Sequence, residues 1–158
     1  ITVTGKCIAQ QRNFVMRVGT SFAQILDAIG GLPVTAAKFI SGGPMMGKAV
    51  SNIDASVLKG TSAFLLLTEE ETKRQPEDSC IRCGKCVEVC PMGLEPYLLN
   101  TLSRMGGQEA ELEKNDRQDC IECGCCLYPC PAHIPLLDVI RVNKAAVLRI
   151  IKGRTAKK

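Results

Sequence analysis

Two cysteine runs constrain the fold of this chain more than any other feature. Residues 80–91 read C-I-R-C-G-K-C-V-E-V-C-P, and residues 120–131 read C-I-E-C-G-C-C-L-Y-P-C-P. Both follow the pattern C-I-x-C-G-x-C-x-x-x-C-P, which indicates one structural unit used twice. Three cysteines with two residues between neighbours let one loop supply three thiolate corners of an iron-sulfur cube. The repeat therefore predicts two 4Fe-4S clusters.

The fourth ligand of each cluster must come from outside its three-cysteine loop. Where two such runs share a domain, the last cysteine of each run ligates the cluster of the other run. The proline after that cysteine suits the first position of a helix, so the chain turns away there. We therefore predict crossed ligation, with Cys80, Cys83, Cys86 and Cys130 holding the first cluster and Cys120, Cys123, Cys126 and Cys90 holding the second.

Other uses of cysteine fit the spacing less well. Structural zinc sites usually have two separated C-x2-C pairs, not three cysteines in one turn followed by C-P. A disulfide framework is typical of secreted chains, and no signal peptide is present in the sequence. Of the ten cysteines, the two runs leave Cys7 and Cys125 as predicted free thiols, Cys7 buried in a strand. Using Cys125 in place of Cys126 would break the repeat spacing.

Composition is that of a soluble protein of one or two domains. The chain has 158 residues, of which 46% are hydrophobic and 23% charged, with a net charge of +4. Thiolate clusters survive in a reducing compartment, which suggests the cytoplasm. No apolar run approaches the roughly 18 residues that span a bilayer. The chain opens at Ile1, inside a predicted strand, so we expect it to be a piece of a longer protein.

The first part of the chain is predicted to be a small α+β, β-grasp-like domain over residues 1–68. Strands are expected at 1–8, 13–18, 37–40 and 62–67 because these segments are rich in β-branched and other apolar residues. A helix is expected at 22–29, capped by Thr20 or Ser21 and ended by a glycine pair. The loop 42–47, G-G-P-M-M-G, lacks the usual phosphate-binding spacings, so we interpret it as a packing or contact loop.

The second part is predicted to be a helical ferredoxin domain over residues 80–152, after a charged linker at 69–79. A helix is expected at 96–105, with Leu98, Leu102 and Met105 on one face, followed by a polar helix at 109–114. A long amphipathic helix is predicted from residue 135 to 152, and a basic tail from 153 to 158. His133 follows C-P-A and is interpreted as a structural residue.

The sequence resembles the C subunit of the Rnf electron-transport complex. The resemblance rests on I-S-G-G-P-M-M-G at 40–47, on the cysteine run continued to residue 94, and on D-C-I-E-C-G through C-P-A-H at 119–133. It implies that the first domain is a soluble-ligand-binding β-grasp domain. It also implies an upstream region with FMN and NADH sites, and a peripheral place on the cytoplasmic side of the cell membrane.

The resemblance implies a role in an ion-translocating NAD-ferredoxin oxidoreductase, an enzyme of the translocase class. The residues themselves support a narrower prediction, an electron carrier without a catalytic acid, base or nucleophile. Expected partners are the other subunits of a membrane complex and a ferredoxin, and no nucleic acid is expected. Two alternatives stay open at this point: the similar cobalamin reductase subunit of propanediol-utilisation microcompartments, and a zinc-organised interaction module.

Overall fold

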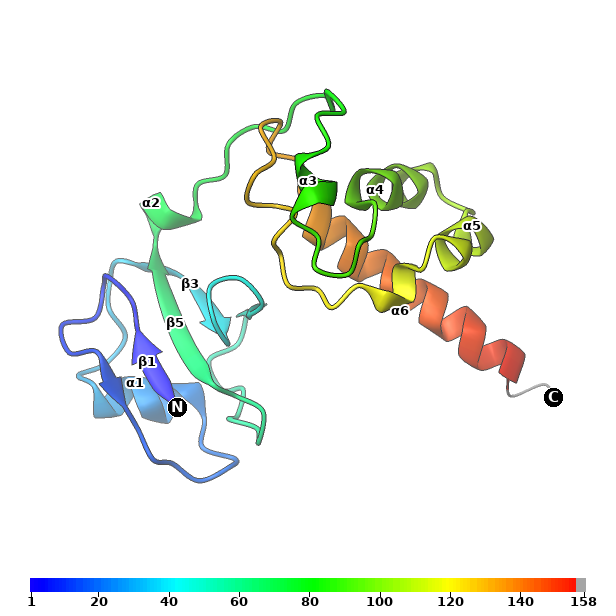
Figure 1. Ribbon diagram of the computed structural model, residues 1–158. Coiled ribbons are helices and arrows are strands. Elements are labelled where there is room, and N and C mark those ends of the chain that lie inside the picture. Colours follow the sequence, from blue (N-terminus) through cyan, green and yellow to red (C-terminus); the bar gives the residue numbers. More distant parts are fainter. Residues whose placement is uncertain (156–158) are drawn as a thin grey trace. The chain divides into compact units, whose positions relative to one another are not determined.

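The chain forms two compact units, described here for residues 1–155 of a computed structural model (Figure 1). The first unit, Ile1–Arg74, contains a five-stranded sheet and a helix that covers it. The second begins at Gln75 and is built from helices and loops. This arrangement confirms the predicted α+β class.

The sheet of the first unit is mixed, with its last strand in the centre. Its strands are β1 (Thr2–Thr4), β2 (Arg12–Asn13), β3 (Ala36–Ser41), β4 (Lys48–Val50) and β5 (Ala63–Thr68). The spatial order is β2-β1-β5-β3-β4, in which β5 runs parallel to β1 and antiparallel to β3. Within β5, Phe64 and Leu66 are fully buried, whereas the residues that alternate with them are only partly buried.

Two predicted strands are shorter than expected. β1 stops at Thr4 because Gly5 takes a φ of +151°, and a Cβ there would lie 2.1 Å from the Leu66 carbonyl oxygen. β2 ends at Asn13. Phe14 still exchanges backbone hydrogen bonds with Ile1, and the chain then leaves the sheet. Val15 and Val18 are exposed, so their β-branched character does not make a strand without a neighbour to pair with.

One helix packs on the sheet to form the first core. Helix α1 (Phe22–Ala28) is capped by Ser21, whose hydroxyl accepts from the Gln24 N–H while the Gln24 side chain accepts from the Ser21 N–H. The rings of Phe22 and Phe64 stack at 4.2 Å between centroids, which joins the helix to the central strand. The rest of the buried core consists of Val3, Ile8, Ile25, Leu26, Val57 and Leu66.

The acidic segment after the sheet, predicted as a linker over 69–79, begins with a short helix. Glu69–Thr72 form the short helix α2, whose first turn carries three glutamates. Thr68 is its N-cap, and Glu71 folds back to accept a hydrogen bond from the Thr68 N–H at 3.0 Å. Carboxylates are favourable at a helix N-terminus, so this run is a helix start in addition to a connector.

The second unit is a set of short helices around one long helix. Its elements are α3 (Lys85–Glu88), α4 (Pro96–Met105), α5 (Glu109–Lys114), the 3-10 helix η1 (Arg117–Asp119) and α6 (Leu136–Thr155). The helices predicted at 96–105 and 109–114 are confirmed. The long helix continues three residues beyond its predicted end at 152, into the predicted basic tail, whose residues 156–158 lie outside the described part of the chain.

The apolar face predicted for α4 is only partly buried: Leu98 and Leu102 are half-buried, and Leu102 packs against the core. Met105 is 68% exposed, whereas the buried residues of the helix are Pro96, Leu99, Asn100 and Ser103. Two of these are polar and therefore do not appear in a hydrophobic pattern. They are buried because each has a side-chain partner: Asn100 accepts from Arg104, and Ser103 accepts from Arg117.

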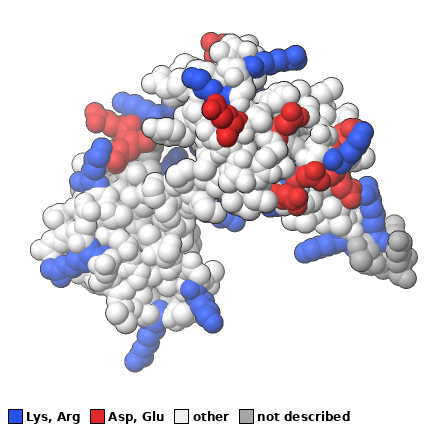
Figure 2. Space-filling view, in the orientation of Figure 1, with Lys and Arg blue, Asp and Glu red and all other residues white. Residues whose placement is uncertain are grey.

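Charged side chains of both signs share the surface of the helical unit. Figure 2 shows Lys and Arg interspersed with Asp and Glu on the face drawn there. Ion pairs contribute to this mixture, among them Arg154 with Glu113 at 2.8 Å and Arg104 with Glu77 at 2.7 Å. Within residues 1–155, no helix has both the length and the apolar character needed to cross a bilayer.

Candidate metal centres

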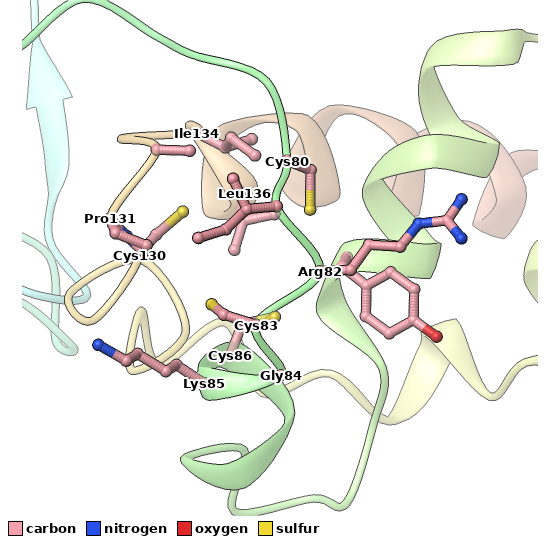
Figure 3. A pocket seen from close by; sticks show the side chains of 13 residues that line it. Cys80, Arg82, Cys83, Gly84, Lys85, Cys86, Cys130, Pro131, Ile134 and Leu136 are labelled. Carbon is pink, nitrogen blue, oxygen red and sulfur yellow. The ribbon is translucent and has the colours of Figure 1, made fainter.

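The first hollow of the helical unit brings together cysteines from both runs. Cys80, Cys83, Cys86 and Cys130 line a cavity of about 260 Å³ (Figure 3). Apolar side chains of Ala132, Ile134 and Leu136 complete its wall, and the Arg82 and Lys85 side chains extend away from it. The fourth cysteine comes from the second run, so this is the grouping expected for crossed ligation.

The second hollow contains the other four cysteines of the repeat. It is lined by Cys90 from the first run and by Cys120, Cys123 and Cys126 from the second. Leu94, Leu99 and Ile140 add apolar wall. This hollow has a much smaller volume, about 20 Å³. Its four cysteines, and not its volume, indicate a cluster here.

The backbone repeats together with the cysteines. Three matching positions in each run have positive φ. They are the second residue after the first cysteine, the glycine after the second cysteine and the third residue after the last cysteine. These residues are Arg82, Gly84 and Gly93 in the first run and Glu122, Gly124 and His133 in the second. Left-handed conformations reverse the chain locally. Their recurrence indicates that the two loops wrap their thiols in the same way.

This repeat accounts for His133. Its φ of 51° matches the 65° of Gly93, and its side chain is exposed. Ile134, like Leu94 after Gly93, is buried directly after the turn. His133 therefore serves as a turn residue, where histidine is among the residues that tolerate a left-handed backbone.

We expect His133→Gly to leave cluster content unchanged and to alter the free energy of unfolding by less than about 1 kcal/mol. Glycine relieves the left-handed strain but loses more entropy on folding. His133→Val should lower the free energy of unfolding by about 1–2 kcal/mol, because a β-branched residue fits a positive φ poorly. Anaerobic urea unfolding with iron analysis measures both. Loss of iron in His133→Gly would instead show that the imidazole serves a cluster.

Backbone amides point at two of the predicted ligands. The Leu94 N–H donates to Cys90 Sγ at 3.4 Å. The backbone amide of Tyr97, in the first turn of α4, forms a hydrogen bond with Cys86 that lowers the pKa of this thiol. Hydrogen bonds to ligand sulfurs favour the thiolate and contribute to setting a cluster's potential.

Burial acts against thiolate formation in the protein alone. Desolvation, followed by the neighbouring thiols of Cys120 and Cys123, raises the pKa of Cys126 to about 12. Desolvation is also the largest influence on Cys86 and leaves the pKa of this thiol raised despite the Tyr97 amide. Metal ligation requires deprotonated sulfur, so binding of iron must compensate for this cost.

The donor set around each hollow, four cysteines from the two runs, is one that an iron-sulfur cluster takes. Within residues 1–155, no group of three or more His, Cys, Asp or Glu side chains is arranged to hold one metal ion. A zinc ion needs its thiolates within about 2.3 Å of one point, whereas a 4Fe-4S cube takes one thiolate at each of four separate irons. Four cysteines around each hollow provide that set.

The two remaining cysteines lie outside these groups. Cys125 does not line the second hollow; its thiol interacts with Cys123, which is the largest influence raising its pKa. Cys7 is half-buried, with its thiol 3.7 Å from the Leu66 carbonyl oxygen, and burial raises its pKa. All ten cysteines are free thiols in the structure. That Cys125 binds no iron stays a prediction.

The glycine loop at 42–47 is closed by its own backbone. The Gly47 N–H donates to the Gly43 carbonyl at 2.9 Å, and a Cβ on Gly47 would lie 2.4 Å from that oxygen. Met45 and Met46 are about half exposed, at 52% and 54%. The glycines thus serve close backbone packing, and the methionines are presented at the surface as predicted.

Each of the two parts of the chain matches a known protein family. Residues 72–131 match a family described as a 4Fe-4S dicluster domain, and residues 1–49 match the SLBB domain. The chain is 44% identical over 103 residues to the C subunit of the proton-translocating ferredoxin:NAD(+) oxidoreductase complex of Clostridium ljungdahlii, an alignment that covers 65% of the chain and 22% of that protein.

Two further relatives have similar names. The C subunit of the Na(+)-translocating ferredoxin:NAD(+) oxidoreductase complex of Acetobacterium woodii is 44% identical, over 61% of the chain and 22% of the relative. The C subunit of the ion-translocating oxidoreductase complex of Rhodobacter capsulatus is 39% identical, over 69% of the chain and 21% of the relative. The chain is a relative of these C subunits. The alignments span about a fifth of the length of these relatives.

The resemblance to Rnf-type C subunits is thereby confirmed, but one residue beside the second hollow was not predicted. Arg117, in η1, is fully buried and lies within electrostatic reach of Cys120. In the sequence it stands in a polar stretch between Lys114 and Asp119, where charged residues are usually exposed. No local pattern distinguishes it, because its burial depends on packing against α5 and α6.

Proposed function

We propose that this chain carries single electrons through two 4Fe-4S clusters, as part of an Rnf-type ion-translocating NAD-ferredoxin oxidoreductase. One observation carries the proposal: each of two hollows is lined by three cysteines of one run and the last cysteine of the other. Such clusters, when bound, accept and release one electron each.

Apolar residues of the protein hold the two sites close together and exclude water between them. Ala132, Ile134 and Leu136 form a buried apolar cluster. Cys86 and Cys130 of the first group and Cys126 of the second all pack against it. Reciprocal ligation would therefore hold two redox sites on one rigid support, which suits passage of charge between them.

The first site is the more accessible one. Cys80 and Cys83 are exposed, whereas the four thiols of the second group are all partly buried. Ile81, between the two exposed ligands, is itself 69% exposed. We place exchange of electrons with a ferredoxin-type or membrane partner at this side.

On the basis of the named relatives, we extend the proposal to the role of this chain in a larger complex. We also propose that the complex contains a two-electron flavin and NADH site outside this chain. Association with the cytoplasmic face of the membrane would occur through the other subunits of the complex. In this arrangement the chain links a two-electron donor to a one-electron partner.

The test is anaerobic purification of the chain followed by iron, acid-labile sulfide and zinc analysis. The proposal expects a brown protein with about eight irons and eight sulfides per chain. Dithionite reduction should give electron paramagnetic resonance signals from two interacting clusters. A colourless protein with stoichiometric zinc and no labile sulfide would overturn it.

A further inference from the structure

The helical unit buries a charged side chain three residues before Cys120, which lines the second hollow. Arg117 has no exposed surface. By volume, it is the largest fully buried side chain in the described part of the protein. Burying an unpaired guanidinium is costly, so such residues normally have several partners. Arg117 is therefore a residue whose charge needs an explanation.

The hydrogen bonds of Arg117 are incomplete. Its Nη1 donates to Ser103 Oγ at 3.0 Å, but Nε and Nη2 have no hydrogen-bond partner in the described chain. Desolvation lowers its pKa to about 10, while the neighbouring Cys120 and Glu122 act in the opposite direction. A guanidinium stays protonated in proteins, so Arg117 is a buried cation.

The nearby carboxylate already has other partners. Glu122 accepts from Arg141 Nε at 3.1 Å and lies 3.7 Å from Lys144 Nζ. The single negative charge of Glu122 is thus shared with two other cations and does not neutralise Arg117. What remains near Arg117 is the thiol of Cys120, whose backbone N–H also bonds to the Arg117 carbonyl at 3.3 Å.

The first run differs at the matching position. Three residues before its first cysteine stands Glu77, where the second run has Arg117. The Glu77 side chain is 39% exposed and pairs with Arg104 at 2.7 Å. Arg82 lies inside the first run but is exposed, so water and salt screen its charge. The second site therefore has a fully buried positive charge that the first lacks, in addition to the partly buried Lys144, which donates to the Cys120 carbonyl oxygen.

We propose that Arg117 raises the reduction potential of the cluster held by the second run, relative to that of the first run. This inference rests on the proposed two-cluster function. Reduction adds one electron to an anionic cluster, and a fixed cation in a low-dielectric site stabilises the more negative state. Arg117 would act through the cluster's surroundings as a tuning residue, without ligating iron.

The experiment is a potentiometric titration of the full chain followed by electron paramagnetic resonance. The second cluster is identified as the one whose signal is lost in Cys123→Ser. Arg117→Met removes the charge but keeps an unbranched side chain. We expect it to shift the second cluster's reduction equilibrium about tenfold toward the oxidised form, which is about 59 mV for one electron. Arg117→Lys should keep most of the wild-type potential.

Arg149→Met is the matched control, because Arg149 is an exposed arginine of α6. It should leave both potentials unchanged. If Arg117→Met does not hold the second cluster, Arg117→Gln is titrated in its place. Loss of that cluster in both neutral variants with retention in Arg117→Lys would also support the charge.

Three results would overturn the inference. The first is an unchanged potential in a neutral variant that retains both clusters. The second is an equal shift of the second cluster's potential in Arg117→Met and Arg117→Lys. The third is loss of that cluster in all the Arg117 variants. Either result would show that the packing of the Arg117 side chain matters and its charge does not. Absence of clusters in the wild-type chain would contradict the proposed function, and so is distinguishable from failure of the inference.

Discussion

The Cys90→Ser variant is expected to lose about four of roughly eight irons, and the lost cluster should be the one bound by the second run. Cys90 lies in the first run by sequence, but it lines the second hollow with Cys120, Cys123 and Cys126. The reciprocal variant Cys130→Ser should lose the first run's cluster, because Cys130 lines the first hollow. Both variants are expected to remain folded in the first unit.

Iron and sulfide analysis with electron paramagnetic resonance of the remaining cluster measures this outcome. The signal that survives in Cys90→Ser should match the one that survives in Cys123→Ser, since both changes remove ligands of one hollow. Cys125→Ser is the matched control from the same loop and should keep both clusters. If Cys90→Ser instead matched Cys83→Ser, each run would hold its own fourth ligand and the crossed assignment would be wrong.

Phe64→Ala is expected to unfold or severely weaken the sheet unit and to leave the iron content unchanged. Phe64 is fully buried in the central strand, where its ring stacks on Phe22 at 4.2 Å and lies 6.0 Å from Phe39. Removing a buried phenylalanine side chain typically costs about 3–5 kcal/mol, which is a large part of the stability of a small domain.

Hydrogen exchange read by mass spectrometry separates the two units in this test. Exchange should rise throughout residues 1–74 and stay low in α4 and α6, because the helical unit has its own buried cores. Leu58→Ala is the control, since Leu58 is 67% exposed and its truncation should change little. Iron loss in Phe64→Ala would show that the clusters depend on the sheet unit.

Local sequence patterns predicted several elements well. The proline at 96 and the glycine pair at 106–107 bracket α4. The capped helix near Ser21 and the polar helix at 109–114 also form where short-range rules place them. These features depend on hydrogen bonds between residues three or four apart, which a single sequence displays.

Features that depend on neighbouring segments were predicted poorly. Residues 14–18 contain the β-branched Val15 and Val18, but the pairing of β2 with β1 ends at Asn13 and these residues form no strand. The buried face of α4 includes Asn100 and Ser103, whose burial depends on Arg104 and Arg117. The helix α2 was missed because its acidic residues are typical of both a linker and a helix start.

The cysteine repeat by itself predicts which eight thiols would bind the clusters, because a cube needs three closely spaced ligands and one distant ligand. The repeat also predicts crossed ligation, and the tertiary structure brings the last cysteine of each run into the hollow lined by the other run's three cysteines. That pairing depends on how α4 and α6 pack and on where the chain turns at Gly93 and His133. The buried charge of Arg117 was likewise decided by packing, since burial is a property of the surrounding helices and not of the residue.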